Sequence, residues 1–200
     1  MTPRAILIIV DLLNDFFDRS PVLAAQRARL VAATNALSQG FRAAGAPVFW
    51  VRQEFAPDLS DAFPEMRRKK LAVTIAGTPG CQLLPELEVA PEDIVLVKKR
   101  YSAFFGTDLD QRLARLRPER LVIAGVNTHA CVRMTVLDAY QRDYETVVAA
   151  DCVASNDPEH HEVTVRYLDG KITRFLSNEA ILALLDGHGG EGAHPIPDAG

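Results

Sequence analysis

The chain has 200 residues, of which 48% are hydrophobic and 24% are charged, and its formal net charge is −4. This composition is typical of a globular domain with one core, and it argues against intrinsic disorder, collagen and coiled coil. The acidic balance offers no basic surface to a phosphate backbone, so we expect no nucleic acid partner.

No membrane or secretion signal stands out in the chain. The first apolar run is interrupted by Asp11, Asn14 and Asp15, and no run approaches the roughly 18 residues that a membrane span needs. We therefore expect no signal peptide and no membrane partner. An odd number of cysteines without paired spacing fits free thiols in a reducing compartment, which predicts a cytoplasmic protein. These cysteines are Cys81, Cys131 and Cys152.

Short, nearly continuous apolar runs recur along the chain, as is typical of strands that are covered on both faces. The predicted strands are residues 5–10, 47–51, 94–97, 121–126, 146–150 and, with a weaker pattern, 172–176. Segments of helical period lie between them. This alternation predicts βαβ units and a three-layer α/β/α domain.

Helix boundaries are marked by capping residues. Ser20 and Pro21 predict the start of a helix that continues to Gly45, and Thr107 predicts the N-cap of a helix that ends before Pro118. The other predicted helices are residues 128–142, 158–170 and 178–185.

Two segments do not fit a minimal α/β unit. Residues 53–93 connect the second and third strands and are unusually long, so they form either a lid or binding loop, or a solvated insertion that touches no ligand. The sequence after Gly187 is rich in glycine and proline. We therefore expect one domain over residues 1–187 and a disordered tail over 188–200.

Reactive side chains follow three of the predicted strands. Asp11 follows the first strand, Lys98 follows the third, and Cys131 lies in the first turn of the helix after the fourth. Taken singly, each has a structural interpretation as a cap, a surface charge or a small buried hydrophobe. Because ligands in open α/β sheets bind beyond the carboxyl ends of the strands, we expect the three to meet there.

Their joint position predicts nucleophilic catalysis. A helix N-terminus and a nearby ammonium group both lower the pKa of a thiol, and Cys131 is placed to receive both effects. Asp11 would take the thiol proton as general base, and Lys98 would hold the charges in register. Backbone amides of the turn over 127–131 could bind an oxyanion. The residues predict acyl transfer from an uncharged carbonyl compound, without identifying the substrate.

Four segments together resemble the isochorismatase-like cysteine hydrolase superfamily, over nearly all of the chain up to Leu185. They are IIVDLLNDFF, VLVKKRYSAFFGTDL, VIAGVNTHACVRMTVLDAY and VVAADCVAS. The resemblance implies a six-stranded parallel sheet in the order 3-2-1-4-5-6, a triad of Asp11, Lys98 and Cys131, and a homo-oligomer of two or more copies. It also implies a cis peptide bond between Val126 and Asn127, and an oxyanion hole made by the amides of Asn127 and Cys131.

The superfamily contains several activities. Isochorismatases cleave a vinyl ether without a covalent intermediate and can lack the cysteine, so the presence of Cys131 favours hydrolysis of a C–N bond through a thioester. Nicotinamidases carry a metal site built on a D-x-H segment after the second strand, where this chain has residues 51–55, VRQEF. The resemblance therefore implies no metal, no cofactor and no nicotinamidase activity. Vinyl ether hydrolysis, or a scaffold with an unused pocket, stays as an alternative.

Further side chains could wall a pocket for a small-molecule substrate. The resemblance points to Phe16, Arg52, Gln53, Tyr101 (or Phe105), Phe104 and His129. The aromatic members could equally belong to the core, and the guanidinium of Arg52 would suit a substrate that bears a carboxylate. The superfamily pattern makes His129 a pocket or structural residue, not the base of a Cys/His dyad. His160 and His161 are adjacent on a helix and face different ways, which indicates structural roles.

Overall fold

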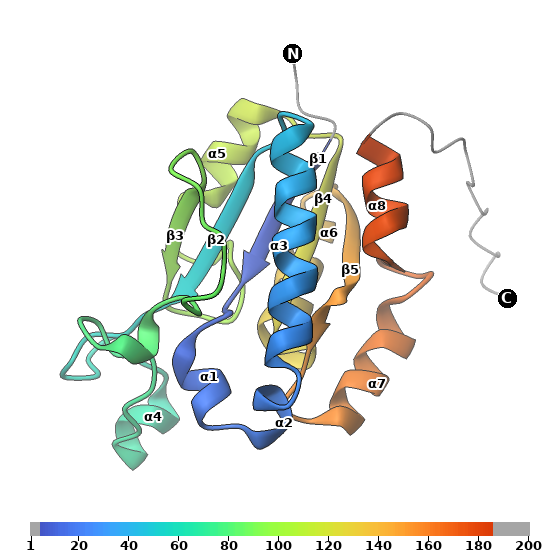
Figure 1. Ribbon diagram of the computed structural model, residues 1–200. Coiled ribbons are helices and arrows are strands. Elements are labelled where there is room, and N and C mark those ends of the chain that lie inside the picture. Colours follow the sequence, from blue (N-terminus) through green and yellow to red (C-terminus); the bar gives the residue numbers. More distant parts are fainter. Residues whose placement is uncertain (1–4, 186–200) are drawn as a thin grey trace, which may run out of the picture.

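Six parallel strands form one sheet in the order β3-β2-β1-β4-β5-β6 in the computed structural model, which describes residues 5–185 (Figure 1). The strands are β1 (Ala5–Val10), β2 (Val48–Gln53), β3 (Ile94–Lys98), β4 (Arg120–Val126), β5 (Glu145–Ala154) and β6 (Arg174–Leu176). This order confirms the predicted sheet. The tail predicted over residues 188–200 lies outside the described residues.

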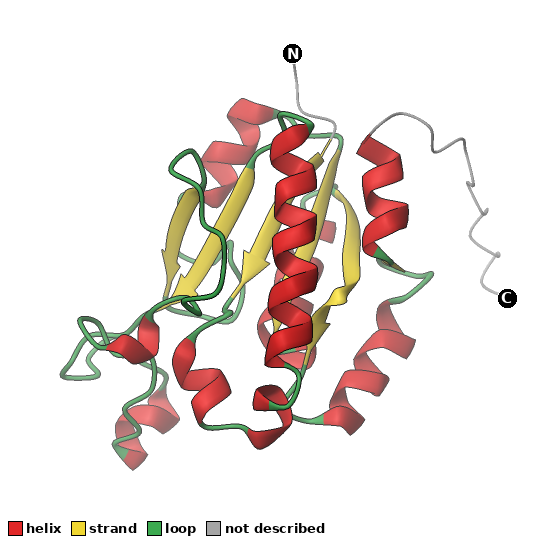
Figure 2. Ribbon diagram, viewed as in Figure 1, coloured by secondary structure: helices red, strands yellow, loops and turns green. Residues whose placement is uncertain are grey.

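Helices cover both faces of the sheet, as the alternating pattern predicted (Figure 2). The helices are α1 (Asn14–Asp18), α2 (Pro21–Ala24), α3 (Arg27–Ala43), α4 (Pro64–Lys69), η1 (Pro79–Cys81), α5 (Leu109–Leu116), η2 (Thr128–Val132), α6 (Arg133–Tyr140), α7 (Pro158–Leu168) and α8 (Asn178–Leu185). Side chains of α3 and α8 enter one hydrophobic cluster, and side chains of α5, α6 and α7 enter the other. None of the helices within residues 5–185 has the length and apolar character needed to cross a membrane.

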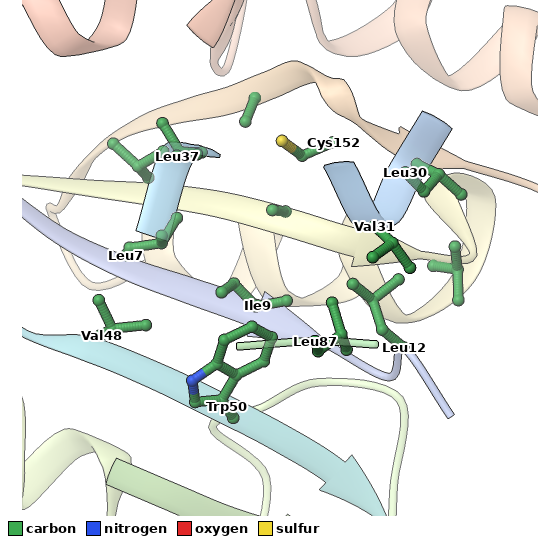
Figure 3. Close-up of a cluster of buried hydrophobic side chains, with 14 of the residues drawn as sticks. Leu7, Ile9, Leu12, Leu30, Val31, Leu37, Val48, Trp50, Leu87 and Cys152 are labelled. Carbon is green, nitrogen blue, oxygen red and sulfur yellow. The ribbon is translucent and has the colours of Figure 1, made fainter. Parts of the chain in front are cut away.

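The two clusters divide the side chains of β1 between them. Leu7 and Ile9 point to the α3 side, where they pack with Trp50 and Leu37 (Figure 3), while Ile8 points to the other side. All are fully buried. Burial of each such side chain stabilises the fold by about 1.5–3 kcal/mol, so β1 is held firmly in the sheet. The position of Asp11, which follows β1, is held with it.

β5 is longer than the sequence predicted. It continues past the charged Asp151 to Ala154, so Cys152 lies inside the strand rather than after it. The carboxylate of Asp151 accepts a hydrogen bond from the amide of Asn178 at 2.7 Å, which gives it a partner within the fold. The pairing of β5 with β4 shifts register between Ile123 and Gly125, and this irregularity lets the strand continue.

Two predicted helices begin differently in the structure. The helix predicted from Pro21 onward is two helices, α2 and α3, although Ser20 caps α2 as predicted by accepting a hydrogen bond from Leu23 at 3.2 Å. The apolar stripe that carried the prediction starts only at Leu30, so the pattern could not separate them. The N-cap of α5 is Asp108, not Thr107, although the Thr107 hydroxyl accepts from the amide of Leu109 at 3.2 Å while it donates to Ala103 O at 2.6 Å.

Candidate active site

Asp11, Lys98 and Cys131 meet at the carboxyl ends of the strands. The Nζ atom of Lys98 lies 2.6 Å from Oδ2 of Asp11 and 3.4 Å from Sγ of Cys131. Asp11 and Lys98 are fully buried and Cys131 is 3% exposed. The acid, ammonium and thiol expected from three distant parts of the sequence are therefore in contact.

The two charged groups of this cluster are held by backbone groups as well as by each other. Lys98 donates to Arg100 O at 3.0 Å, so its ammonium faces three acceptors, which matches its three protons. Oδ1 of Asp11 accepts from the amide of Gln53 at 2.8 Å. Burying a charged group destabilises a fold unless the group is paired with an opposite charge and hydrogen-bonded. Lys98 and Asp11 each meet these two conditions.

The backbone that presents Asp11 takes an uncommon conformation. Asp11 has a φ angle of +58°, in the left-handed region, and Gly125, which pairs with Val10 just before it, has a φ angle of +113°. A Cβ atom on Gly125 would lie 1.9 Å from the carbonyl oxygen of Val10. Only glycine allows β1 and β4 to approach this closely beside the site.

Burial changes the acidity of the thiol in the direction opposite to our sequence-based expectation. Desolvation raises the pKa of Cys131, and Lys98 lowers it by less, while the Asp11 carboxylate raises it further. For Lys98, desolvation lowers the pKa, but the charges of Asp11 and Cys131 outweigh it and raise the pKa overall. The free site thus favours a protonated thiol on Cys131 beside a charged ammonium group on Lys98.

The turn that carries Cys131 has the backbone features of an anion-binding loop. The peptide bond between Val126 and Asn127 is cis, as the family resemblance implied. η2 is a π-helical turn in which Asn127 O accepts from Ala130 N at 3.0 Å and from Val132 N at 3.3 Å. Neither of these two bonds uses the amide of Cys131.

The start of α7 and the residues before it hold this turn in place. The amide of Asn156 donates to Oδ1 of Asn127 at 2.8 Å, and Nδ1 of His161 lies 2.9 Å from Oγ1 of Thr128. Ser155 supplies the third contact, with its Oγ 2.6 Å from Nδ1 of His129. Three consecutive residues of the loop over 127–131, which we call the nucleophile loop after the role proposed for Cys131, therefore each contact a residue within 155–161.

These contacts give structural roles to the histidines. Oγ of Ser155 also accepts a hydrogen bond from the amide of Asp157 at 3.0 Å, so this side chain joins His129 to the start of α7. His160 pairs with Asp157 at 2.8 Å, and its ring centroid lies 5.6 Å from that of His129. Burial lowers the pKa of His129, and likewise that of His161. The sequence did not indicate that Ser155 and His161 contact the loop, because both follow a different strand.

The predicted polar pocket residues Arg52 and Gln53 are the last two residues of β2. Arg52 forms an ion pair with Glu54 at 3.2 Å and donates to Oε1 of Gln82 at 2.7 Å, so its charge already has a partner. Gln53 is 5% exposed, and its side-chain nitrogen has no hydrogen-bond partner in the structure. The Nε atom of Arg52 is likewise buried without a hydrogen-bond partner, so each of the two side chains has an unpaired donor.

The aromatic candidates are spread over different surroundings. Phe16 is half-buried on α1, against the first core cluster. Tyr101 is 47% exposed and packs on Phe63 at 4.7 Å, and Phe105 is 63% exposed. Phe104 lies in the core: it is 3% exposed, and its ring stacks on Tyr144 at 6.5 Å. Its contacts give Phe104 a packing role, in line with the core alternative.

The long connection over residues 53–93 packs against the segment that follows Asp11. The amide of Thr74 donates to Oδ2 of Asp15 at 2.6 Å, Asn14 donates to Pro79 O at 2.9 Å, and the amide of Leu84 donates to Leu12 O at 2.9 Å. The connection is therefore packed against the rest of the domain, and its role as a lid or binding loop stays a prediction. In the fold, part of the connection lies beside the carboxyl ends of β2 and β3, and its last part runs back along the sheet to the start of β3 (Figure 1).

The histidine, cysteine and carboxylate side chains of residues 5–185 form no group of three or more that could hold a metal ion. The place at the end of β2 where nicotinamidases carry metal ligands holds Arg52, Gln53 and Glu54 instead.

The sheet order and the site define an α/β domain of the isochorismatase-like class. The model of the Isochorismatase domain matches residues 5–180, and the chain belongs to this family. A probable inactive nicotinamidase of Arabidopsis thaliana is 35% identical over 174 residues, which are 82% of this chain and 87% of that protein. The ureidoacrylate amidohydrolase RutB of Methylobacterium radiotolerans is 34% identical over 183 residues, 76% of this chain and 68% of that enzyme.

Solved structures agree with this assignment. An isochorismatase family protein from Desulfovibrio vulgaris superposes with a TM-score of 0.81 at 29% identity, covering 92% of this chain and 99% of that chain. The family includes hydrolases such as the ureidoacrylate amidohydrolase, and these matches do not identify a substrate for this chain.

Proposed function

We propose that the protein is a cysteine hydrolase that cleaves a C–N bond of a small amide, carbamoyl or ureido compound through a thioester. The observation that carries the proposal is the contact of Lys98 with both Asp11 and Cys131 in a water-excluded site. The similarity to a ureidoacrylate amidohydrolase supports the ureido class among these substrates.

In the first half of the reaction, Asp11 takes the thiol proton of Cys131 while the sulfur bonds to the carbonyl carbon of the substrate. The carbonyl oxygen gains negative charge, and the amides of Asn127 and Cys131 donate hydrogen bonds to it. Asp11 then passes the proton to the leaving nitrogen as the C–N bond breaks. Ammonia or an amine departs, and the acyl group stays on sulfur as a thioester.

In the second half, Asp11 takes a proton from water, and the water oxygen attacks the thioester carbonyl. The C–S bond breaks, the acid product leaves, and the proton returns to the sulfur of Cys131. Lys98 keeps its proton throughout, because its neighbours raise its pKa. The positive charge of Lys98 stabilises the thiolate of Cys131 and the carboxylate of Asp11, whichever of the two is ionised at a given step.

A second candidate is vinyl ether hydrolysis of the isochorismatase type, which needs Asp11 as an acid but no thiolate. The raised pKa of Cys131 favours this candidate, since a buried protonated thiol is a poor nucleophile until its proton is removed. A scaffold with an unused pocket is the third possibility. The buried ion pair of Asp11 and Lys98 beside the thiol of Cys131 supports catalysis over this possibility.

Intact mass spectrometry tests the proposal directly. The protein is mixed with a small library of amides and ureides, quenched in acid and weighed. We expect an acyl adduct on Cys131 with at least one compound, and none with Cys131→Ala. Turnover of a substrate by Cys131→Ala at the wild-type rate would reject the thioester route in favour of the vinyl ether type of chemistry.

A further inference from the structure

The outer edge of β3 is an unprotected strand edge. β3 is the first strand of the sheet, and within residues 5–185 only β2 pairs with it. Its residues 94–97 are all apolar, with no proline, charge or bulge among them. Soluble proteins usually protect an exposed edge with one of these devices, because an open edge recruits another strand.

Two valines on this edge face solvent. Val95 and Val97 are 46% and 39% exposed, whereas Leu96 between them is 5% exposed and belongs to the core. Because side chains alternate along a strand, both valines project from the same face of the sheet. An apolar surface therefore lies directly beside the open backbone edge.

The pairing of β3 with β2 shows which backbone groups of β3 point away from the sheet. The carbonyl of Lys98 accepts from the amide of Glu54, so the backbone groups of Lys98 and, by alternation, of Leu96 point to β2. The amides and carbonyls of Val95 and Val97 then point outward. These are the groups that a further strand would bind.

We propose that β3 pairs in antiparallel fashion with β3 of a second copy of this chain, about a twofold axis through Leu96, to form one continuous sheet. In this register Val95 of each copy lies opposite Val97 of the other, so their outward backbone groups are bonded and four valines form one apolar cluster. The symmetry is closed, as expected for a dimer.

The charges beside the strand fit this register. It places Glu92, which is exposed, opposite Arg100 of the second copy. Moving the axis to Val97 would set Lys99 against Val95, and moving it to Val95 would set Val97 against Asp93. The axis at Leu96 is thus the register that sets the exposed valines against each other and the acids Glu92 and Asp93 against Arg100 and Lys99, with Ile94 opposite Lys98.

Sedimentation velocity of the full chain over a wide concentration range tests the interface. We expect a dimer for the wild type and a monomer for Val95→Lys, which places a charge in the valine cluster. Val95→Pro should also be monomeric, because it removes an outward amide while leaving the bonds to β2 intact. The matched control is Val163→Lys on α7, whose side chain is 42% exposed in the wild type, and it should remain a dimer.

Hydrogen exchange of the peptide that covers residues 94–98 adds a readout that does not depend on the variants. Exchange at Val95 and Val97 should slow as the wild-type concentration rises. A wild type that stays monomeric, or a dimer that survives Val95→Lys with unchanged exchange over 94–98, would overturn the proposal. Circular dichroism of each variant separates loss of the dimer from loss of the fold.

Discussion

Lys98 and Asp11 form a fully buried ion pair of 2.6 Å although their strands are not neighbours. β2 lies between β1 and β3, so the two side chains meet beyond its end, where the amide of Gln53 binds the same carboxylate. The pair therefore links three strands at the edge of the sheet. This arrangement ties the stability of the fold to the groups that we assign to catalysis.

Replacing Lys98 should destabilise the fold as well as abolish activity. Lys98→Met leaves the Asp11 carboxylate buried without its partner, which costs about 3–5 kcal/mol. The double variant Asp11→Asn with Lys98→Met removes both charges and should recover most of this stability, but no activity. Urea denaturation of the three proteins checks the expectation. Equal stability of Lys98→Met and the wild type would mean that the ion pair has no net effect on folding.

The pattern of the sequence was enough to bring the triad together, because Asp11 and Lys98 lie at strand ends and parallel strands place those ends at one edge. It could not give the acidity of Cys131, since that depends on how much water the folded chain excludes from the sulfur. It also missed Ser155 and His161, whose contacts with the nucleophile loop exist only because the chain returns beside η2 after β5. Local patterns predict elements and their ends, while burial and packing partners follow from the whole fold.

The pH dependence of Cys131 alkylation should reveal the raised pKa of its thiol. The thiolate is the reactive form, and burial raises the pKa, so the anion is scarce at neutral pH and its population grows only at higher pH. Iodoacetamide labelling should increase with pH beyond the point where glutathione, with an ordinary thiol pKa of about 8.5, has levelled off. Peptide mass spectrometry locates the label. A labelling curve that levels off below that of glutathione would contradict a raised pKa.

Loosening the connection over residues 53–93 should expose the thiol. Asp15 on α1 accepts a 2.6 Å hydrogen bond from Thr74, which fastens the connection to α1. Asp15→Ala should therefore increase the rate of Cys131 alkylation at a fixed pH. Asp18→Ala is the control, since Asp18 lies on the same helix with a side chain that is 67% exposed. Equal rates in the two variants would show that this bond does not limit access.

The contact between Thr128 and His161 should matter for catalysis more than for folding. Thr128→Val keeps the volume of the buried side chain but removes the hydroxyl that lies 2.9 Å from Nδ1 of His161. Because this contact holds the turn that carries the oxyanion donors, we expect kcat to fall by about 10²-fold, the scale for loss of one such donor, with KM little changed.

Thr164→Val is the matched control for that variant. Thr164 is also a buried threonine, on α7, but its hydroxyl has no hydrogen-bond partner in the structure. Removing an unpaired buried hydroxyl should leave kcat unchanged and leave stability equal or higher, because no bond is lost and a desolvated polar atom is removed. Steady-state kinetics on the substrate found by mass spectrometry compares the two variants. If both lose activity alike, buried threonines affect the site only through packing, and Thr128 has no particular role in positioning the nucleophile loop.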